Sequence, residues 1–272
     1  MDFEPVVIGA ALPVQALAQH RDWLLGAPRD VELQSFHSHE NLSGDWSAAV
    51  AEAKRQLDGH TGRLGIHGPF WGFTIHSQDP DIRAVVARRM MQALDVCAAL
   101  GATQMVIHSP YSTWDDFNLD GYPSAREMVI ENTRATLAEV VARAMDDGVE
   151  LVMENIADRN PHDRRILAEA LGDGVQLSVD TGHANWAHHA TGAPPVDYFI
   201  RLAGARLAHV HLQDTDGHAD RHWAIGEGNI AWTAVFREIA ALGGVPRPVL
   251  ELRDHTRIPA SFAYLRGLGL VR

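Results

Sequence analysis

The chain of 272 residues contains one cysteine, Cys97, and one lysine, Lys54. A lone cysteine cannot form an internal disulfide, and Cys97 falls on the apolar face of an expected helix, so we interpret it as a buried, reduced thiol. Lys54 lies in the pattern AAVAEAKRQL, which predicts a surface helix. Schiff-base and pyridoxal chemistry need a lysine in a pocket, so this position argues against both.

Long apolar runs are also missing, and stretches such as VVIGAAL are only strand-sized, so we expect no membrane span. Met1 is followed by acidic residues rather than by a basic stretch and an apolar run, so we expect no secretion signal and a cytoplasmic location. The 35 acidic against 23 basic residues give a net charge of −12. This balance argues against a broad nucleic-acid-binding surface, but not against a local groove lined with metal ions.

What recurs along the chain is a short apolar or β-branched run followed by a longer helical pattern. The runs lie at 5–10, 31–36, 63–70, 103–110, 149–156, 175–184, 206–214 and 248–254. Eight such alternations predict parallel strands with helical crossovers, and eight strands can close a barrel. A doubly wound open sheet is the alternative, but IGAALPVQ lacks its glycine-rich phosphate-binding motif. We therefore expect one (β/α)8 TIM barrel domain over residues 1–272.

Imidazoles and carboxylates stand where six consecutive predicted strands end, or in the loops just after them. They are His67, His108, Glu154, Asp180, His183, His211, Asp220, His222 and Glu251. Taken alone, each is more typical of a hydrogen-bonded loop histidine, a helix N-cap or a solvated charge. As a set they would repel one another at the barrel mouth unless a cation lay between them. Their chemistry favours zinc, manganese, cobalt or iron, so we expect a divalent metal site.

The segment HVHLQD places two histidines on one face of a strand, because His209 and His211 are two residues apart. If His211 binds a metal, His209 faces the same way one layer deeper. It then either supports the ligand or packs in the core.

The motifs IHGPF, VIHSPY, VMENI, VDTGHA, HVHLQDTDG, DRHWAIGEGNI and LEL resemble, in order and spacing, the xylose-isomerase-like TIM barrel superfamily. That superfamily contains sugar isomerases and epimerases as well as endonuclease IV DNA-repair enzymes. The resemblance to the isomerase and epimerase branch implies one metal ion on Glu154, Asp180, His211 and Glu251. The resemblance to the endonuclease branch implies three zinc ions, with His67, His108, His183, Asp220 and His222 as further ligands.

Three features depart from the endonuclease branch. The first strand reads IGAALPV where that branch has Gly-x-His-x-Ser, the chain is acidic and nearly lysine-free, and HSHENLSGDW after the second strand holds no basic cluster. In addition, the stretch HLQDTDG…DRHWAIGEG is similar to uncharacterised isomerase-like members.

The first hypothesis is therefore a metal-dependent isomerase or epimerase of a ketose or keto-sugar, in which Glu154 and Glu251 transfer the proton alpha to the carbonyl. Its cofactor would be one divalent ion, Mn, Zn, Co or Mg, and its partner a small sugar rather than nucleic acid. The expected substrate-binding residues are His67, His108, His183, Phe70, Trp71, Arg221 and Arg253. The alternatives are a zinc-dependent nuclease at abasic sites, for which Phe70 and Trp71 would be DNA wedges, and a non-catalytic binding barrel. A homo-oligomer is compatible with either enzyme.

Overall fold

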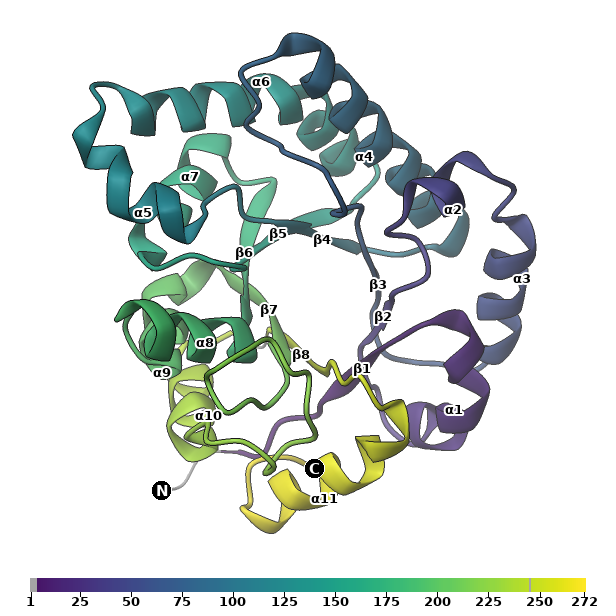
Figure 1. Ribbon diagram of the computed structural model, residues 1–272. Coiled ribbons are helices and arrows are strands. Elements are labelled where there is room, and N and C mark those ends of the chain that lie inside the picture. The colour runs from purple at the N-terminus through teal and green to yellow at the C-terminus, as the bar shows by residue number, and fades with distance from the viewer. Residues whose placement is uncertain (1–3, 245) are drawn as a thin grey trace.

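The computed structural model describes residues 4–244 and 246–272, and its eight strands form one closed parallel barrel. Figure 1 shows this barrel along its axis, with the helices arranged around the outside. The strands are β1 (Gly9–Leu12), β2 (Val31–Leu33), β3 (Leu64–His67), β4 (Gln104–His108), β5 (Glu150–Glu154), β6 (Val175–Asp180), β7 (Leu207–Leu212) and β8 (Arg247–Leu250). Each strand pairs with the next in sequence, and β1 closes the ring against β8. The (β/α)8 barrel predicted from the sequence is confirmed.

Helices cover the outer face of the barrel between successive strands. They are α1 (Leu17–Leu25), α2 (His39–Ser43), α3 (Ser47–Gln56), α4 (Pro80–Leu100), α5 (Thr113–Asn118), α6 (Ala125–Asp146), α7 (Pro161–Leu171), α8 (Thr181–Thr191), α9 (Val196–Ala203), α10 (Trp232–Ala241) and α11 (Ile258–Gly267). Short 3-10 turns lie at Val14–Ala16, Leu119–Gly121, Gly204–Arg206 and His255–Arg257.

The ends of α4 follow directly from its sequence. Asp79 caps the N-terminus by accepting the Asp81 N–H, and Pro80 fills the first turn, where no backbone donor is needed. At the other end Gly101 adopts a left-handed φ of 75° and sends the chain toward β4. Cys97 is fully buried in this helix, and Lys54 is exposed on α3, as the sequence predicts.

The first strand lies further along the chain than the sequence pattern predicts, at Gly9–Leu12 rather than 5–10. Val6 instead forms an isolated bridge with Val271. The apolar run is therefore divided between a contact with the C-terminal segment and a barrel strand, and hydrophobicity alone does not distinguish the two.

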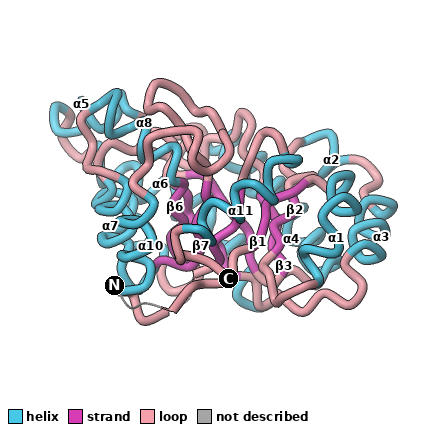
Figure 2. Tube along the Cα trace, turned by 90° about the horizontal axis from the view of Figure 1, so that it is seen from below, coloured by secondary structure: helices cyan, strands magenta, loops and turns pink. Residues whose placement is uncertain are grey.

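The strand register brings the ends of neighbouring strands to one level. His108 lies opposite Glu154, and Asp180 lies opposite His211. Figure 2 shows the strands in the middle of the molecule, with α5 and α8 beyond one end of them and the C-terminus toward the other. Among the described residues, no helix is long and apolar enough to cross a membrane.

Candidate functional site

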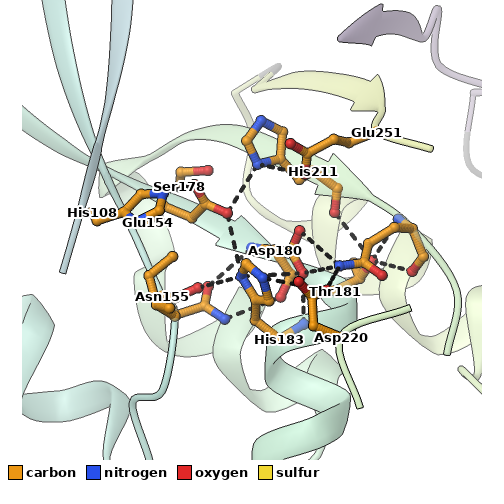
Figure 3. A network of polar contacts seen from close by, with 12 residues as sticks. His108, Glu154, Asn155, Ser178, Asp180, Thr181, His183, His211, Asp220 and Glu251 are labelled. Carbon is orange, nitrogen blue, oxygen red and sulfur yellow. Dashed lines mark hydrogen bonds and ion pairs between the residues drawn. The ribbon is translucent and has the colours of Figure 1, made fainter. Parts of the chain in front are cut away.

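Four side chains meet at the centre of the barrel mouth. Glu154 ends β5, Asp180 ends β6, His211 lies in β7, and Glu251 follows β8 directly. All four are buried, and each offers a ligand atom within 4.8 Å of those of the others. Figure 3 shows Glu154 and Glu251 on either side of the His211 ring. We call these residues the central group.

The two ring nitrogens of His211 face different surroundings. Nδ1 lies 3.1 Å from Glu154 Oε1 and 3.3 Å from Glu251 Oε2, so it points into the central group. Nε2 points down into the barrel and lies 2.9 Å from Oε2 of Glu32, a buried residue of β2. A carboxylate that accepts the Nε2 proton leaves Nδ1 available for a metal ion, as in many carboxylate–histidine–metal arrangements.

His209 lies one layer below His211 and holds Glu32 from the other side. Its Nε2 is 3.2 Å from Glu32 Oε2, and its Nδ1 is 3.1 Å from the Ser178 hydroxyl. His209 therefore has both of the roles considered for it. It is buried in the core, and it supports His211 indirectly by contacting the Glu32 carboxylate beneath that ring.

Buried oxygen atoms without hydrogen bonds show where a cation fits. Within the described residues, Glu154 Oε2 and Glu251 Oε2 are buried and accept no hydrogen bond. The other oxygen of Glu251 accepts a hydrogen bond from the Gln34 side chain on the segment after β2. Unsatisfied carboxylate oxygens beside an imidazole suit a divalent ion with nitrogen and oxygen ligands, so the central group could hold one.

Two further sets of ligand atoms flank the central group. One consists of His67, His108 and Glu154, and the other of His183, Asp220 and His222. In the first set, His67 Nε2 lies 3.5 Å from Glu154 Oε2. In the other set, Asp220 Oδ1 lies 3.5 Å from His183 Nε2 and 3.1 Å from His222 Nε2. We call the set of His67, His108 and Glu154 the second group, and the set of His183, Asp220 and His222 the third group.

The pKa shifts have opposite signs within this small volume. Burial raises the pKa of Glu154, but His211, His183 and His67 outweigh it and lower that pKa well below its ordinary value. Burial raises the pKa of Asp180 to about 7, against His183 and together with the charge of Glu154. Burial also lowers the pKa of His108 to about 3. Closely spaced acids with divergent pKa values are typical of functional sites.

Asp180 links the site to the outer helices. As the N-cap of α8, its Oδ1 accepts the His183 N–H at 2.6 Å, which places His183 above the central group. Asn155 holds the Asp180 backbone in turn, because its side chain accepts the Asp180 N–H at 2.9 Å and donates to the Asp180 carbonyl at 3.1 Å.

Aromatic rings lead from the surface toward the second group. Phe70 stacks on His108 with ring centroids 4.4 Å apart, and Trp71, which is 70% exposed, lies 5.0 Å beyond it. His37, from the loop after β2, packs against the Phe70 ring at 5.0 Å. These rings form one wall of the mouth.

The structure brings nine of the sequence-predicted residues into the three groups, but Arg221 and Arg253 lie apart. The Arg221 guanidinium pairs with Asp216 at 3.0 Å and lies over the Trp223 ring. Arg253 is exposed, and its backbone N–H donates to the His222 carbonyl at 3.0 Å.

Sequence reasoning missed several polar residues that support the site, namely the buried Glu32, Asn155 and Gln213 and the half-buried Gln34 and His37. A usable signal was present for two of them. Glu32 and Gln34 alternate within VELQSF, a run expected to be buried, so both face the barrel interior.

The chain belongs to the xylose isomerase-like TIM barrel family, whose sequence profile matches residues 29–269. Among curated proteins, it is 26% identical over 193 residues to the uncharacterised protein MJ1311 of Methanocaldococcus jannaschii, covering 65% of this chain and 60% of that protein. It is also 22% identical over 166 residues to the fructoselysine 3-epimerase of Shigella flexneri, covering 59% of this chain and 56% of the enzyme. Both matches span less than two thirds of those relatives.

Solved structures match over nearly the whole chain. The TTHB071 protein from Thermus thermophilus, soaked with ZnCl2, is 29% identical with a TM-score of 0.73, covering 97% of this chain and 99% of that one. A D-tagatose 3-epimerase-like protein is 21% identical with a TM-score of 0.75, covering 98% of both chains. The second likeness supports the fold alone.

Proposed function

We propose that this protein is a divalent-metal-dependent epimerase or isomerase of a ketose or keto-sugar. The observation that carries the proposal is the pair of buried carboxylates, Glu154 and Glu251, that face each other across His211 Nδ1, each with one oxygen that accepts no hydrogen bond. The similarity to a fructoselysine 3-epimerase and to a D-tagatose 3-epimerase-like protein supports this class of reaction.

In this mechanism one carboxylate removes the proton from the carbon next to the carbonyl, and the other returns a proton to the opposite face or the neighbouring carbon. One of the two must be ionised while its partner is protonated. A bound divalent ion would hold the carbonyl and an adjacent hydroxyl and would acidify the C–H bond on the carbon next to the carbonyl. Glu154, Asp180, His211 and Glu251 would bind that ion.

The remaining predicted residues would bind and orient the sugar. His183, His67 and His108 line the mouth and can hydrogen-bond substrate hydroxyls, while Phe70 and Trp71 provide an apolar wall. Arg221 and Arg253 lie further out, so we assign them to the distal end of the substrate.

The test is proton exchange with solvent. With Mn²⁺ in heavy water, the wild-type protein is expected to place deuterium on the carbon next to the carbonyl of D-tagatose or fructoselysine. Glu154→Gln and Glu251→Gln should each lower turnover by about 10²–10⁴, the usual contribution of a positioned acid or base. The surface variant Glu169→Gln is the control and should behave as wild type. Turnover without incorporated deuterium would contradict the two-base mechanism.

The second candidate is hydrolysis of a phosphodiester at an abasic site in DNA by a three-metal centre. The second and third groups favour it, because they place additional ligands on both sides of the central group. Multinuclear sites can stabilise both the attacking and the leaving oxygen of a phosphoryl transfer. Chelator-sensitive cleavage of a duplex carrying one abasic site, with no exchange on either sugar, would favour this candidate.

A further inference from the structure

Arg164 is a fully buried arginine on the inner face of α7, the helix that lies outside β5 and β6 (Figure 1). Its side chain reaches the backbone of both strands. Nη1 donates to the Met153 carbonyl of β5 at 2.7 Å and also to the Ser178 carbonyl of β6. Because Nη1 carries two hydrogen atoms, this one nitrogen can serve both carbonyls and join the two strands.

The bridge lies where the backbone pairing of β5 and β6 ends. Glu154 opposite Ser178 is the last pair in the register of these strands, and the chain then leaves β5 for the loop that leads to α7. The Asn155 side chain continues the connection, since it accepts the Asp180 N–H and donates to the Asp180 carbonyl (Figure 3). Side chains thus join the two strands at the level where Glu154 and Asp180 enter the central group.

The charge of Arg164 is balanced by Asp158, which is also buried. Asp158 Oδ1 lies 3.6 Å from Arg164 Nε and accepts the Ser109 hydroxyl at 2.7 Å, and Oδ2 accepts the Ile156 N–H at 2.9 Å. The Ser109 N–H in turn donates to the Glu154 carbonyl at 2.8 Å. The ion pair therefore connects the chain that leaves β4 with the chain that leaves β5.

A buried ion pair is a costly way to join these segments. Burial lowers the pKa of Arg164 and raises that of Asp158, and the opposite charge of the partner works against each shift. Such a pair is weak evidence for stability, but it can fix one arrangement of the chain. A guanidinium suits that use because its donors have fixed directions in one plane. Arg164 can hold two carbonyls and face one carboxylate only when β5, β6 and the loop after β5 are correctly aligned.

We infer that Arg164 is a positioning residue that sets the spacing of Glu154 and Asp180 by joining the ends of β5 and β6 from outside the barrel. It acts through the backbone, since its partners are the residue before Glu154 and the residue two positions before Asp180. The inference rests on the proposed function, in which Glu154 moves the substrate proton. A catalytic group misplaced by about 1 Å can cost about 10²-fold in rate, so losing the bridge should lower kcat by about 10–100-fold.

The first experiment measures proton exchange of D-tagatose with Mn²⁺ in heavy water. The double variant Asp158→Asn/Arg164→Gln, which leaves no unpaired buried charge, is expected to lose about 10–100-fold in kcat while KM changes much less, because the side chains that line the mouth are intact. Arg164→Lys keeps a charge beside Asp158 but lacks the planar fork, so its kcat should fall between the double variant and wild type.

The matched control is Arg165→Met. Arg165 is the next residue of α7, but its side chain is exposed and pairs with Glu169 at 2.9 Å, so this variant should behave as wild type. Wild-type kcat in the double variant or in Arg164→Lys would overturn the inference. Since Arg164→Lys keeps the buried pair, it carries the test even where the double variant does not fold.

A second measurement needs neither metal nor substrate. In hydrogen exchange on the metal-free proteins, the Asp180 and Ser109 amides should exchange faster in both Arg164 variants than in Arg165→Met, because their acceptors lie on the loosened end of β5. Amides of β1 to β3 should exchange as in wild type. Faster exchange spread equally over all strands would overturn the inference, because Arg164 would then only stabilise the fold. Local loosening in a protein that exchanges no sugar proton would uphold the role of Arg164 in spacing the two acids while removing the proposed reaction.

Discussion

Glu32 places a buried negative charge in the barrel interior, directly beneath His211. A buried carboxylate is costly unless it is paired, and Glu32 is paired with two imidazoles, those of His209 and His211, whose rings meet edge to face. Both rings hold its charged form, and although burial opposes them, they lower the pKa of Glu32 far below its usual range. The negative charge beneath His211 strengthens the Nδ1 lone pair above it.

Glu32→Gln is therefore expected to weaken Zn²⁺ binding by the central group by about 10–100-fold, because a neutral amide orients His211 less firmly. Competition with a chromophoric chelator measures the effect. The exposed variant Glu127→Gln serves as the control. Equal affinity in Glu32→Gln and wild type would show that His211 is oriented by packing alone.

At the scale of elements, α5 and the turn that leads into α7 are joined by a buried acid. The Asp116 carboxylate of α5 accepts the backbone N–H groups of Arg159 and Asn160, just before α7 begins. Burial raises the pKa of Asp116 to about 6, against these two hydrogen bonds and with help from the charges of Asp158 and Asp163. This connection holds the loop that follows Glu154.

The raised pKa predicts how stability depends on pH. In the folded state Asp116 keeps its proton up to about pH 6, whereas in the unfolded chain it loses the proton near 3.8. The folded state therefore binds more protons between these values, and its contribution to the free energy of unfolding falls as the pH rises from about 4 to 6. The full shift corresponds to at most about 3 kcal/mol.

Urea unfolding at pH 4.5 and pH 7 checks this for wild type and Asp116→Asn. The wild-type free energy of unfolding should fall more over this interval than that of the variant, because asparagine does not titrate. Asp120→Asn removes a nearby exposed acid and should leave the wild-type difference unchanged. Parallel pH profiles for all three proteins would contradict the buried-acid explanation.

At the scale of the whole molecule, strand-end acids and histidines converge on one mouth, while the layers below are closely packed. A metal ion bound there would contact β5, β6, β7 and the residue after β8, and would link strands that are far apart in the sequence. A ligand that binds only the folded state raises stability by mass action, by about 2.7 kcal/mol at 100 times its dissociation constant.

Added Zn²⁺ or Mn²⁺ should accordingly raise the Tm of chelator-treated protein, and removing the ion should lower it again. Asp180→Asn should lose most of this rise, since it removes a charge from the central group, while its far-UV circular dichroism stays that of a barrel. Differential scanning calorimetry with and without metal gives the comparison. An undiminished rise of Tm in Asp180→Asn would place the stabilising ion elsewhere.

The sequence by itself determined the barrel and the end of it that carries the polar residues. Eight apolar runs separated by helical patterns are compatible with few fold topologies. In a parallel barrel, successive strands all end at the same rim. The two-residue period of a strand likewise placed His209 and His211 on one face. These conclusions need only local patterns, because strand direction and side-chain alternation are properties of single elements.

Only the tertiary structure decided which buried polar groups meet. Glu32 and His211 are separated by 179 positions in the chain, yet their side chains lie 2.9 Å apart because β2 and β7 face each other across the barrel interior. The shift of β1 and the contacts of the Gln213 amide with Asp180 and Asp220 have the same origin. A pattern of hydrophobicity shows that a residue is buried, but its partner depends on ladder register, loop geometry and the space left by residues such as Gly182.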